Sequence, residues 1–248
     1  MTLFERLAEA IEREERAVLL TVVEGEPLGA HVLVLESGER LGDGVPEAVV
    51  GSAAELIRSH RNRIVEADGV RVFAEVFAPP PRLLVYGAVD TAEALCAAAR
   101  LLGWRTIVAD ARARFATRER LPSADELIVD WPAEAIAQVA PDHATAVVVL
   151  THDEKFDIPA LEGALATDAF YVGALGSRTT QQRRRERLLA RGMPEEALDR
   201  ISGPCGLDIG AGSQPETALS ILAEIVATRA GRAGGPLGAS THRIHAEG

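Results

Sequence analysis

The sequence lacks an excess of basic residues, and this excludes several classes of partner. Its 26 lysines and arginines are outnumbered by 37 aspartates and glutamates, so the net charge is −11 at neutral pH. Nucleic-acid backbones and anionic membrane surfaces bind to basic protein surfaces. We therefore expect no nucleic-acid partner and no membrane partner, although a local pocket can still hold a small anion.

Cysteines and long apolar runs are also scarce. Cys96 and Cys205 form no C-x-x-C motif, which excludes a structural zinc site of the usual spacing. No run approaches the roughly 18 apolar residues of a membrane span, and the charged start lacks the apolar core of a secretion signal. We expect a cytoplasmic protein. We expect no metal site, even at the H-x-x-H of His242 and His245.

Residues 1–78 predict a small α+β domain. Apolar residues at helical spacing indicate an opening helix, and apolar or alternating runs indicate strands. Three consecutive prolines at 79–81 cannot continue a helix or a central strand, so we place a domain boundary there. The expected elements are a helix from residue 3, strands at 17–23, 31–35 and 70–77, and a helix over 47–61.

Residues 82–228 predict a Rossmann-like α/β domain. Strand patterns alternate with helical patterns, which is typical of a parallel sheet covered by helices. The apolar helix at 216–227 is suited either to the core or to self-association. Residues 229–248 are rich in Gly, Ala and Pro, and we expect a flexible tail. Strands are expected at 82–87, 105–110, 126–130, 145–151 and 170–175, and a helix at 90–102.

The segment Gly87-Ala88-Val89-Asp90 stands between a strand and a helix, where G-x-G-x-x-G/A binds dinucleotides. Gly87 permits the tight turn, but Val89 replaces the glycine that lets backbone approach a pyrophosphate. Asp110 ends the second strand, where an acidic residue binds a ribose. The pattern indicates the fold, and it leaves open whether the turn holds a dinucleotide.

Two further segments follow the later strands of this domain. His152 and Asp153 come directly after the most apolar strand, where side chains can transfer protons, although Asp153 is also suited to capping the next helix. Gly176-Ser177-Arg178 leads into another helix, whose free N–H groups, with the arginine, favour an anion site. The arginine run at 183–187 indicates a mostly solvated helix face.

The segment 203–211, Gly-Pro-Cys-Gly-Leu-Asp-Ile-Gly-Ala, is a fourth candidate. Its glycines favour tight backbone paths near a ligand or a subunit contact. Cys205 fits a soft ligand, a sulfur carrier or ordinary packing, and the spacing does not separate these roles.

These segments, in this order, resemble the XdhC/CoxI family of maturation factors for molybdenum hydroxylases such as xanthine dehydrogenase and carbon monoxide dehydrogenase. The resemblance implies a CoxI-type domain followed by a Rossmann domain. It covers nearly all of residues 82–232. The matching stretches are RLLVYGAVD (82–90), LGWRTIVADAR (102–112), LTHDEKFDIPAL (150–161), YVGALGSRTT (171–180), GPCGLDIGA (203–211) and PETALSILAEIVATRAGR (215–232).

The resemblance implies a chaperone that binds molybdenum cofactor (molybdopterin), assists its sulfuration with a cysteine desulfurase and delivers it to a hydroxylase subunit. It implies a homo-oligomer and binding rather than catalysis, so no catalytic residue is expected. The bound form, nucleotide-free pterin or cytosine dinucleotide, stays open. The implied cofactor-binding residues are Gly87, Asp90, Asp110, His152, Asp153, Gly176, Ser177, Arg178 and Asp208.

The chain departs from the family pattern in both domains. The family usually reads G-A-G-D where Val89 interrupts the match. In the first domain the family's S-P-R-x-x-G-A and G-G-C-V-E motifs are replaced by residues 25–30 and 42–47, without the arginine and the cysteine. Two alternatives therefore remain: an NAD(P)-dependent oxidoreductase, or a degenerate nucleotide-binding regulatory relative. The first lacks an obvious Tyr-x-x-x-Lys dyad for hydride transfer.

Overall fold

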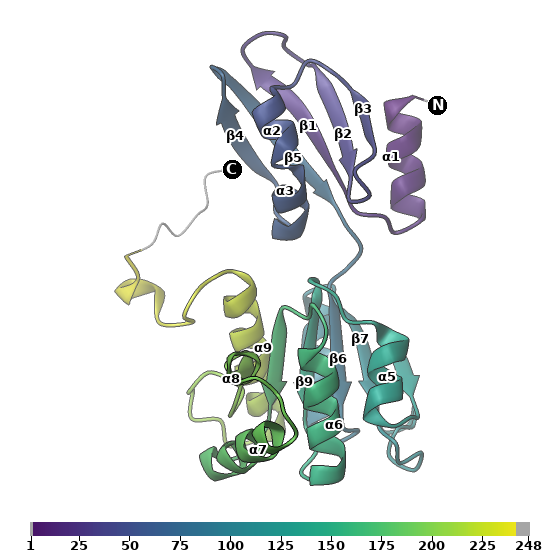
Figure 1. The fold of residues 1–248 in the computed structure, drawn as a ribbon, viewed down its shortest axis with the longest axis vertical. Helices are drawn as coiled ribbons and strands as arrows, with labels where there is room; N and C mark the ends of the chain where they lie inside the picture. Colours follow the sequence, from purple (N-terminus) through teal and green to yellow (C-terminus); the bar gives the residue numbers. More distant parts are fainter. Residues whose placement is uncertain (1, 242–248) are drawn as a thin grey trace. The chain divides into compact units, whose positions relative to one another are not determined.

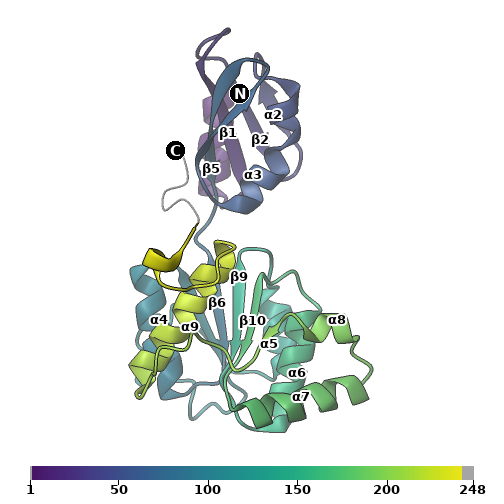
Figure 2. The ribbon, with the colours of Figure 1, turned by 90° about the vertical axis from the view of Figure 1, so that its left-hand side faces the viewer.

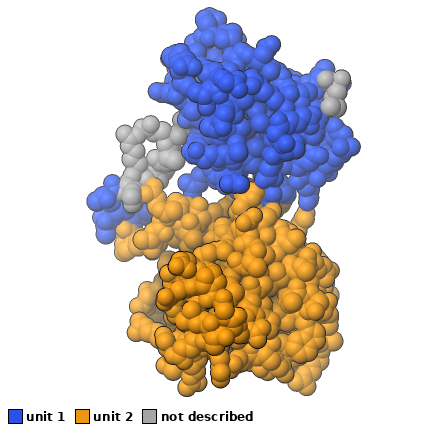
Figure 3. Space-filling model, in the orientation of Figure 1, with its two compact units in different colours: residues 1–79, 237–248 blue, residues 80–236 orange. Residues whose placement is uncertain are grey.

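The computed structural model describes residues 2–241 and divides the chain into two compact units (Figure 3). The division falls between Pro79 and Pro80, inside the three-proline run. The segment from Leu237 is grouped with the first unit, and Pro80–Pro236 form the second. Each unit has its own hydrophobic core.

The first unit is a five-stranded antiparallel sheet with helices on both faces (Figure 1). The strand order is β3-β2-β1-β5-β4, so β1 lies in the centre. Alternate residues of β1 face opposite cores, which α1 covers on one side and α2 with α3 on the other. The elements are α1 (Leu3–Glu12), β1 (Ala17–Glu24), β2 (His31–Leu35), β3 (Arg40–Gly42), α2 (Glu47–Gly51), α3 (Ala53–Ser59), β4 (Arg63–Ala67) and β5 (Val70–Phe77).

The second unit is a six-stranded parallel sheet between two layers of helices (Figures 1 and 2). Its strands are apolar because both faces are covered. The elements are β6 (Arg82–Tyr86), α4 (Asp90–Leu101), β7 (Arg105–Ala109), β8 (Glu126–Ile128), α5 (Pro132–Val139), β9 (Thr145–Val149), α6 (Glu154–Leu165), β10 (Tyr171–Ala174), α7 (Arg178–Ala190), α8 (Glu195–Leu198), β11 (Ile201–Ser202) and α9 (Gln214–Arg229).

The strand order of this sheet is β11-β10-β9-β6-β7-β8. If the strands of the second unit are renumbered from 1 (β6) to 6 (β11) and read from the β8 edge, the order is 3-2-1-4-5-6. This is the order of a doubly wound Rossmann sheet. The chain starts at β6, builds outwards through β7 and β8, and then crosses back to β9. Loops leave in opposite directions at the carboxyl ends of β6 and β9, which is where ligands bind in such sheets. The predicted fold class is confirmed.

The two helix layers fix the sheet from opposite sides. One core joins α4 and α9 to residues such as Val85 and Val148, and the other joins α5, α6 and α7 to neighbours such as Leu84 and Val147. Figure 2 shows α4 and α9 together on one side of the strands. The inward face of α9 (Ala218, Ile221, Leu222 and Ile225) is buried, so this face belongs to the core. Self-association stays a prediction.

Some boundaries differ from the expected ones. The helix predicted over 47–61 is two helices, α2 and α3, and the expected strands of the second unit end one or two residues early. No helix within residues 2–241 is long and apolar enough to cross a bilayer. Leu237–Ala239 form a short 3₁₀ helix in the predicted tail. His242 and His245 lie outside the described residues.

Candidate ligand-binding site

The predicted site residues follow the carboxyl ends of five strands of one parallel sheet, and they therefore share one edge of the second unit. The loops that follow β6, β7 and β9 are linked by contacts at the centre of this edge. Gly87 and Asp90 follow β6, Asp110 follows β7, His152 and Asp153 follow β9, Gly176 to Arg178 follow β10, and Asp208 lies in the loop after β11.

A glycine is required at position 87 because the loops that follow β6 and β9 pass close to each other there. Its φ is +117°, and an added Cβ would lie 2.9 Å from Thr151 Cγ2 and 3.1 Å from Thr151 N. Residues with a side chain rarely adopt this conformation. The backbone after β6 therefore packs directly against the backbone after β9. Val89, the next-but-one residue, is half-buried against the α4 core.

Neighbouring residues already occupy the carboxylate of Asp110 with hydrogen bonds, so it is not available to bind a ribose. Its side chain is 1% exposed, and both carboxylate oxygens accept hydrogen bonds from Arg112, at 2.7–2.9 Å. One oxygen also accepts the Ala88 N–H at 2.9 Å. Burial alone raises the pKa of Asp110, but these hydrogen bonds outweigh it and hold the pKa below its ordinary value. Asp110 thereby fastens the β6 turn to the β7 loop.

The segment after β9 has one buried residue and two exposed ones. Thr151 is buried, whereas His152 and Asp153 are exposed. Asp153 is the N-cap of α6 and accepts the Lys155 N–H at 3.2 Å, so the helix-cap interpretation of this residue is confirmed. His152 is a loop residue beside the place where the β6 and β9 loops meet.

A buried ion pair connects α6 to α7. Arg184 and Asp157 are 5% and 3% exposed, and Arg184 Nε donates to Asp157 Oδ2 at 2.9 Å. Arg184 also donates to the carbonyls of Leu175 and Thr151, and the Thr151 hydroxyl donates to Asp157. This network ties together the loops that follow β9 and β10.

The arginine run 183–187 was expected to be mostly a solvated helix face, and Arg184 is the exception. Gln181, Arg184 and Leu188 recur at helical spacing and point to the interior, while Arg183 and Arg187 are exposed. Arg184 is tolerated inside because Asp157 and two carbonyls satisfy its guanidinium.

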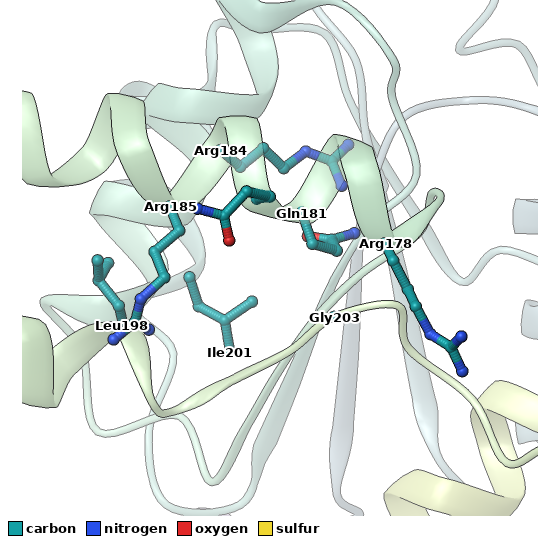
Figure 4. A pocket seen from close by; sticks show the side chains of 8 residues that line it. Arg178, Gln181, Arg184, Arg185, Leu198, Ile201 and Gly203 are labelled. Atoms are coloured by element: carbon teal, nitrogen blue, oxygen red, sulfur yellow. The ribbon is translucent and has the colours of Figure 1, made fainter.

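The start of α7 has the features of an anion site. Ser177 is the N-cap, and its Oγ accepts the Thr180 N–H at 3.1 Å. The first amides of the helix, on Arg178 and Thr179, have no partner within the helix. The exposed Arg178 lines a cavity of about 260 Å³ that extends between α7, α8 and β11. In Figure 4 the side chains of Arg178 and Arg185 point to opposite ends of this cavity.

The loop after β11 is fastened to α9 through Glu224. The carboxylate of Glu224 accepts the Tyr171 hydroxyl at 2.5 Å, the Gly206 N–H at 2.6 Å and the Ser202 hydroxyl. Cys205 is buried, and burial together with the charge of Glu224 raises its pKa to about 12. Its thiol is therefore protonated at neutral pH, as in a packing role. Asp208 lies in the same loop and is exposed.

In the first unit the two replaced family motifs lie against each other. An added Cβ on Gly44 would approach Ala30 Cβ to 2.7 Å and Pro27 Cγ to 3.2 Å. These residues belong to the β1–β2 turn and to the loop before α2. The structure thus brings together the segments from which the expected arginine and cysteine are absent.

Several connecting residues were not among the predicted ones. Arg112, Asp157 and Glu224 each pair with a residue or loop of the site edge. Only weak sequence signals pointed to them: the position of Arg112 two residues after Asp110, and the placement of Asp157 and Glu224 on otherwise apolar helix faces.

Comparison with known proteins places this geometry in a family. The family model for the XdhC Rossmann domain matches residues 83–225, more than half of the chain. The chain belongs to the XdhC family. It is 32% identical over 158 residues to a probable xanthine dehydrogenase subunit of Bacillus subtilis (strain 168). It is 32% identical over 153 residues to the molybdenum cofactor insertion chaperone PaoD of Escherichia coli (strain K12).

These matches cover 64% and 62% of this chain but only 46% and 42% of the two relatives, so the chain spans less than half of their length. A crystal structure of a xanthine dehydrogenase from Bacillus halodurans has the same fold. Its TM-score is 0.69 at 25% identity, over 92% of this chain and 66% of the other. The family resemblance expected from the sequence is confirmed.

Proposed function

We propose that this member of the XdhC family binds molybdenum cofactor and assists its insertion into a molybdenum hydroxylase of the xanthine dehydrogenase or carbon monoxide dehydrogenase type. The names of its relatives, a cofactor insertion chaperone and a xanthine dehydrogenase subunit, support this role. The observation that carries the proposal is the anion site at the start of α7, on the ligand-binding edge of a Rossmann sheet.

The residues at this site fit the phosphate of the cofactor. The free amides of the first turn and the helix dipole attract an anion, and Arg178 adds a charged donor beside the cavity. Gly176, Ser177 and Arg178 would hold the phosphate. Bound there, the cofactor would supply its molybdenum and dithiolene chemistry to the acceptor enzyme, while this chain binds and orients it.

Three of the titratable groups at the edge favour binding over turnover. Asp110 is paired with Arg112, Asp157 with Arg184, and the Cys205 thiol is protonated. A general base needs a free basic group near the reacting atom, and a nucleophile must be ionised or activated there. A sulfur atom for the cofactor would therefore come from a partner cysteine desulfurase, because neither Cys205 nor the first unit provides a reactive thiolate.

The alternative of an NAD(P)-dependent oxidoreductase is less well supported. A ribose diol needs free carboxylate oxygens, but both oxygens of Asp110 are occupied. Val89 also fills the position where a glycine lets a pyrophosphate approach. We therefore place the cofactor phosphate on the β10 side of the sheet, at Arg178.

Delivery is tested by activating an apo-hydroxylase without oxygen. An apo-enzyme of the xanthine dehydrogenase type is mixed with released cofactor and this protein, and the recovered hydroxylase activity is followed. We expect faster and more complete activation than with albumin. The Arg178→Ala variant should lose the gain, and Arg183→Ala, an exposed arginine on the same helix, should keep it. Activation equal to that with albumin contradicts the proposal.

A further inference from the structure

The loop after β7 concentrates positive charge in an acidic chain. Residues 111–120 contain four arginines besides one glutamate, whereas the whole chain has a net charge of −11. Such a reversal of sign attracts anions locally, because nearby charges dominate the potential at a surface. The loop begins at the ligand-binding edge of the sheet, directly after Asp110.

Three of these arginines surround one phenylalanine ring. The guanidinium carbons of Arg112, Arg114 and Arg120 lie 4.5, 4.6 and 5.2 Å from the centroid of the Phe115 ring. Phe115 is itself half-buried against the α4 core, so it is a fixed support for the cluster. Cation–π contacts offset part of the repulsion among the three charges.

Arg112 is preorganised within the cluster. Its Nε and Nη2 donate to Asp110, and its guanidinium carbon also lies 5.5 Å from the Phe156 ring centroid. Two rings and a buried carboxylate therefore fix its plane. Asp110 does not engage its Nη1, and 35% of the side chain is exposed, so this edge of the guanidinium is available to a ligand.

Arg114 and Arg120 complete the cluster from the solvent side. Arg120 pairs with Asp90 at 3.2 Å, and both side chains are exposed, so the pair contributes little and can give way to a ligand anion. Asp90 is the first residue of α4, so the pair places the cluster beside the start of that helix. Arg114 is exposed and contacts the Phe115 ring.

In a Rossmann sheet the loop after the second strand faces the ribose of a bound nucleotide, and an arginine there takes a phosphate on that ribose. Here the carboxylate at the ribose-binding position, that of Asp110, is paired with Arg112. Three arginines of the loop contact the Phe115 ring. We propose that Arg112, Arg114 and Arg120, supported by Phe115, form a binding subsite for the phosphate of a nucleoside phosphate.

The position of this subsite bears on the form of the ligand. Three strand spacings separate β7 from β10, the strand before Arg178. At about 4.8 Å each, the two cationic regions are about 14 Å apart along the edge, too far for one phosphate to fill both. The two phosphates of a nucleotide-linked pterin are joined as one pyrophosphate and cannot fill both regions, so the subsite would take a nucleoside phosphate that binds independently of the cofactor phosphate. The nucleotide subsite does not depend on the function proposed above.

The test is calorimetric titration of the full chain with cytidine 5′-diphosphate, adenosine 2′,5′-bisphosphate and inorganic pyrophosphate. We expect a nucleotide to bind more tightly than pyrophosphate. The double variant Arg114→Gln, Arg120→Gln should lose at least about tenfold in affinity, because two charge-assisted contacts disappear. The charge-matched control, Arg58→Gln with Arg183→Gln, removes two exposed arginines elsewhere and should leave the affinity nearly unchanged.

The two nucleotides separate the possible sources of the ligand. Tighter binding of the cytidine compound supports a subsite for a nucleoside 5′-phosphate, and tighter binding of the adenosine compound supports a subsite for a 2′-phosphorylated nucleotide such as NADP(H). No heat from either nucleotide at millimolar concentration, an equal loss in the control variant, or equally tight binding of pyrophosphate would each overturn the subsite. None of these results depends on whether the purified protein carries molybdenum, so the subsite and the chaperone function can fail separately.

Discussion

Arg184 shows how one residue can organise this edge of the sheet. It is buried, pairs with Asp157 and donates to carbonyls in two loops. Removing one partner of a buried ion pair leaves the other charged without compensation. We expect Arg184→Met to lower the free energy of unfolding by about 3–5 kcal/mol, measured by urea denaturation.

Arg183→Met is the matched control, since Arg183 is an exposed neighbour on the same helix. Its free energy of unfolding should change by less than about 0.5 kcal/mol. Equal, small changes in the two variants would show that the Arg184–Asp157 pair does not hold the loops.

Asp110 gives a pH-dependent prediction. Its folded-state pKa is below that of an unfolded aspartate, so its contribution to stability is fully present above about pH 3.9. The contribution is lost as the pH falls through the lower folded-state pKa. Between about pH 5 and about pH 3, wild type should therefore lose more unfolding free energy than Asp110→Asn. Urea denaturation across this range measures it, and parallel pH profiles would refute the role of the pair.

Gly87 is constrained by packing as well as by its φ. An alanine there would meet Thr151, so we expect Gly87→Ala to cost about 3 kcal/mol. Gly103 also has a positive φ, +73°, but has open space around it. Gly103→Ala should cost only about 1–2 kcal/mol. Thermal unfolding compares the two variants, and similar costs would mean that contact between the two loops is unimportant.

At the scale of elements, the attachment of the β11 loop to α9 depends on Glu224. Glu224→Gln keeps the size of the side chain but weakens an acceptor shared by Tyr171, Ser202 and Gly206. We expect hydrogen exchange at the Gly206 amide to become at least about tenfold faster. Glu196→Gln, an exposed change on α8, should leave this rate unchanged. An unaltered rate in Glu224→Gln would contradict the attachment.

The elements that were predictable from sequence are the ones with strong periodicity. The strands β6, β7, β9 and β10 are apolar runs, and the helix α4 has a regular inward stripe, so their existence follows from pattern alone. The edge strands β3, β4 and β11 were not predicted. Strands this short or this exposed have no apolar run, and tertiary pairing determines them.

The site was predictable in outline because strand ends and glycine-rich turns are local signals. Side-chain pairing across the fold was not. The sequence suggested that Asp110 faces a ribose and that the 183–187 arginines face solvent. Whether a carboxylate or guanidinium is already satisfied depends on distant partners such as Asp157, 27 residues before Arg184. Such pairings are fixed by packing and have no periodic signature.

At the scale of the whole molecule, the chain joins an XdhC Rossmann unit to a first unit without the family's cysteine. The Rossmann unit has a doubly wound strand order, and its ligand-binding edge carries the start of α7 and several arginines. These features favour the binding of an anionic ligand. In the function proposed above, the second unit is therefore the one that would bind the cofactor.

The most direct test of this account is the cofactor content of the protein itself. The chain would be expressed in a host that makes molybdenum cofactor, purified without oxygen, and assayed for molybdenum and pterin per chain. The account predicts near-stoichiometric cofactor on wild type and on Arg183→Ala, and its loss from Arg178→Ala. Wild-type protein that carries neither molybdenum nor pterin would contradict the central claim.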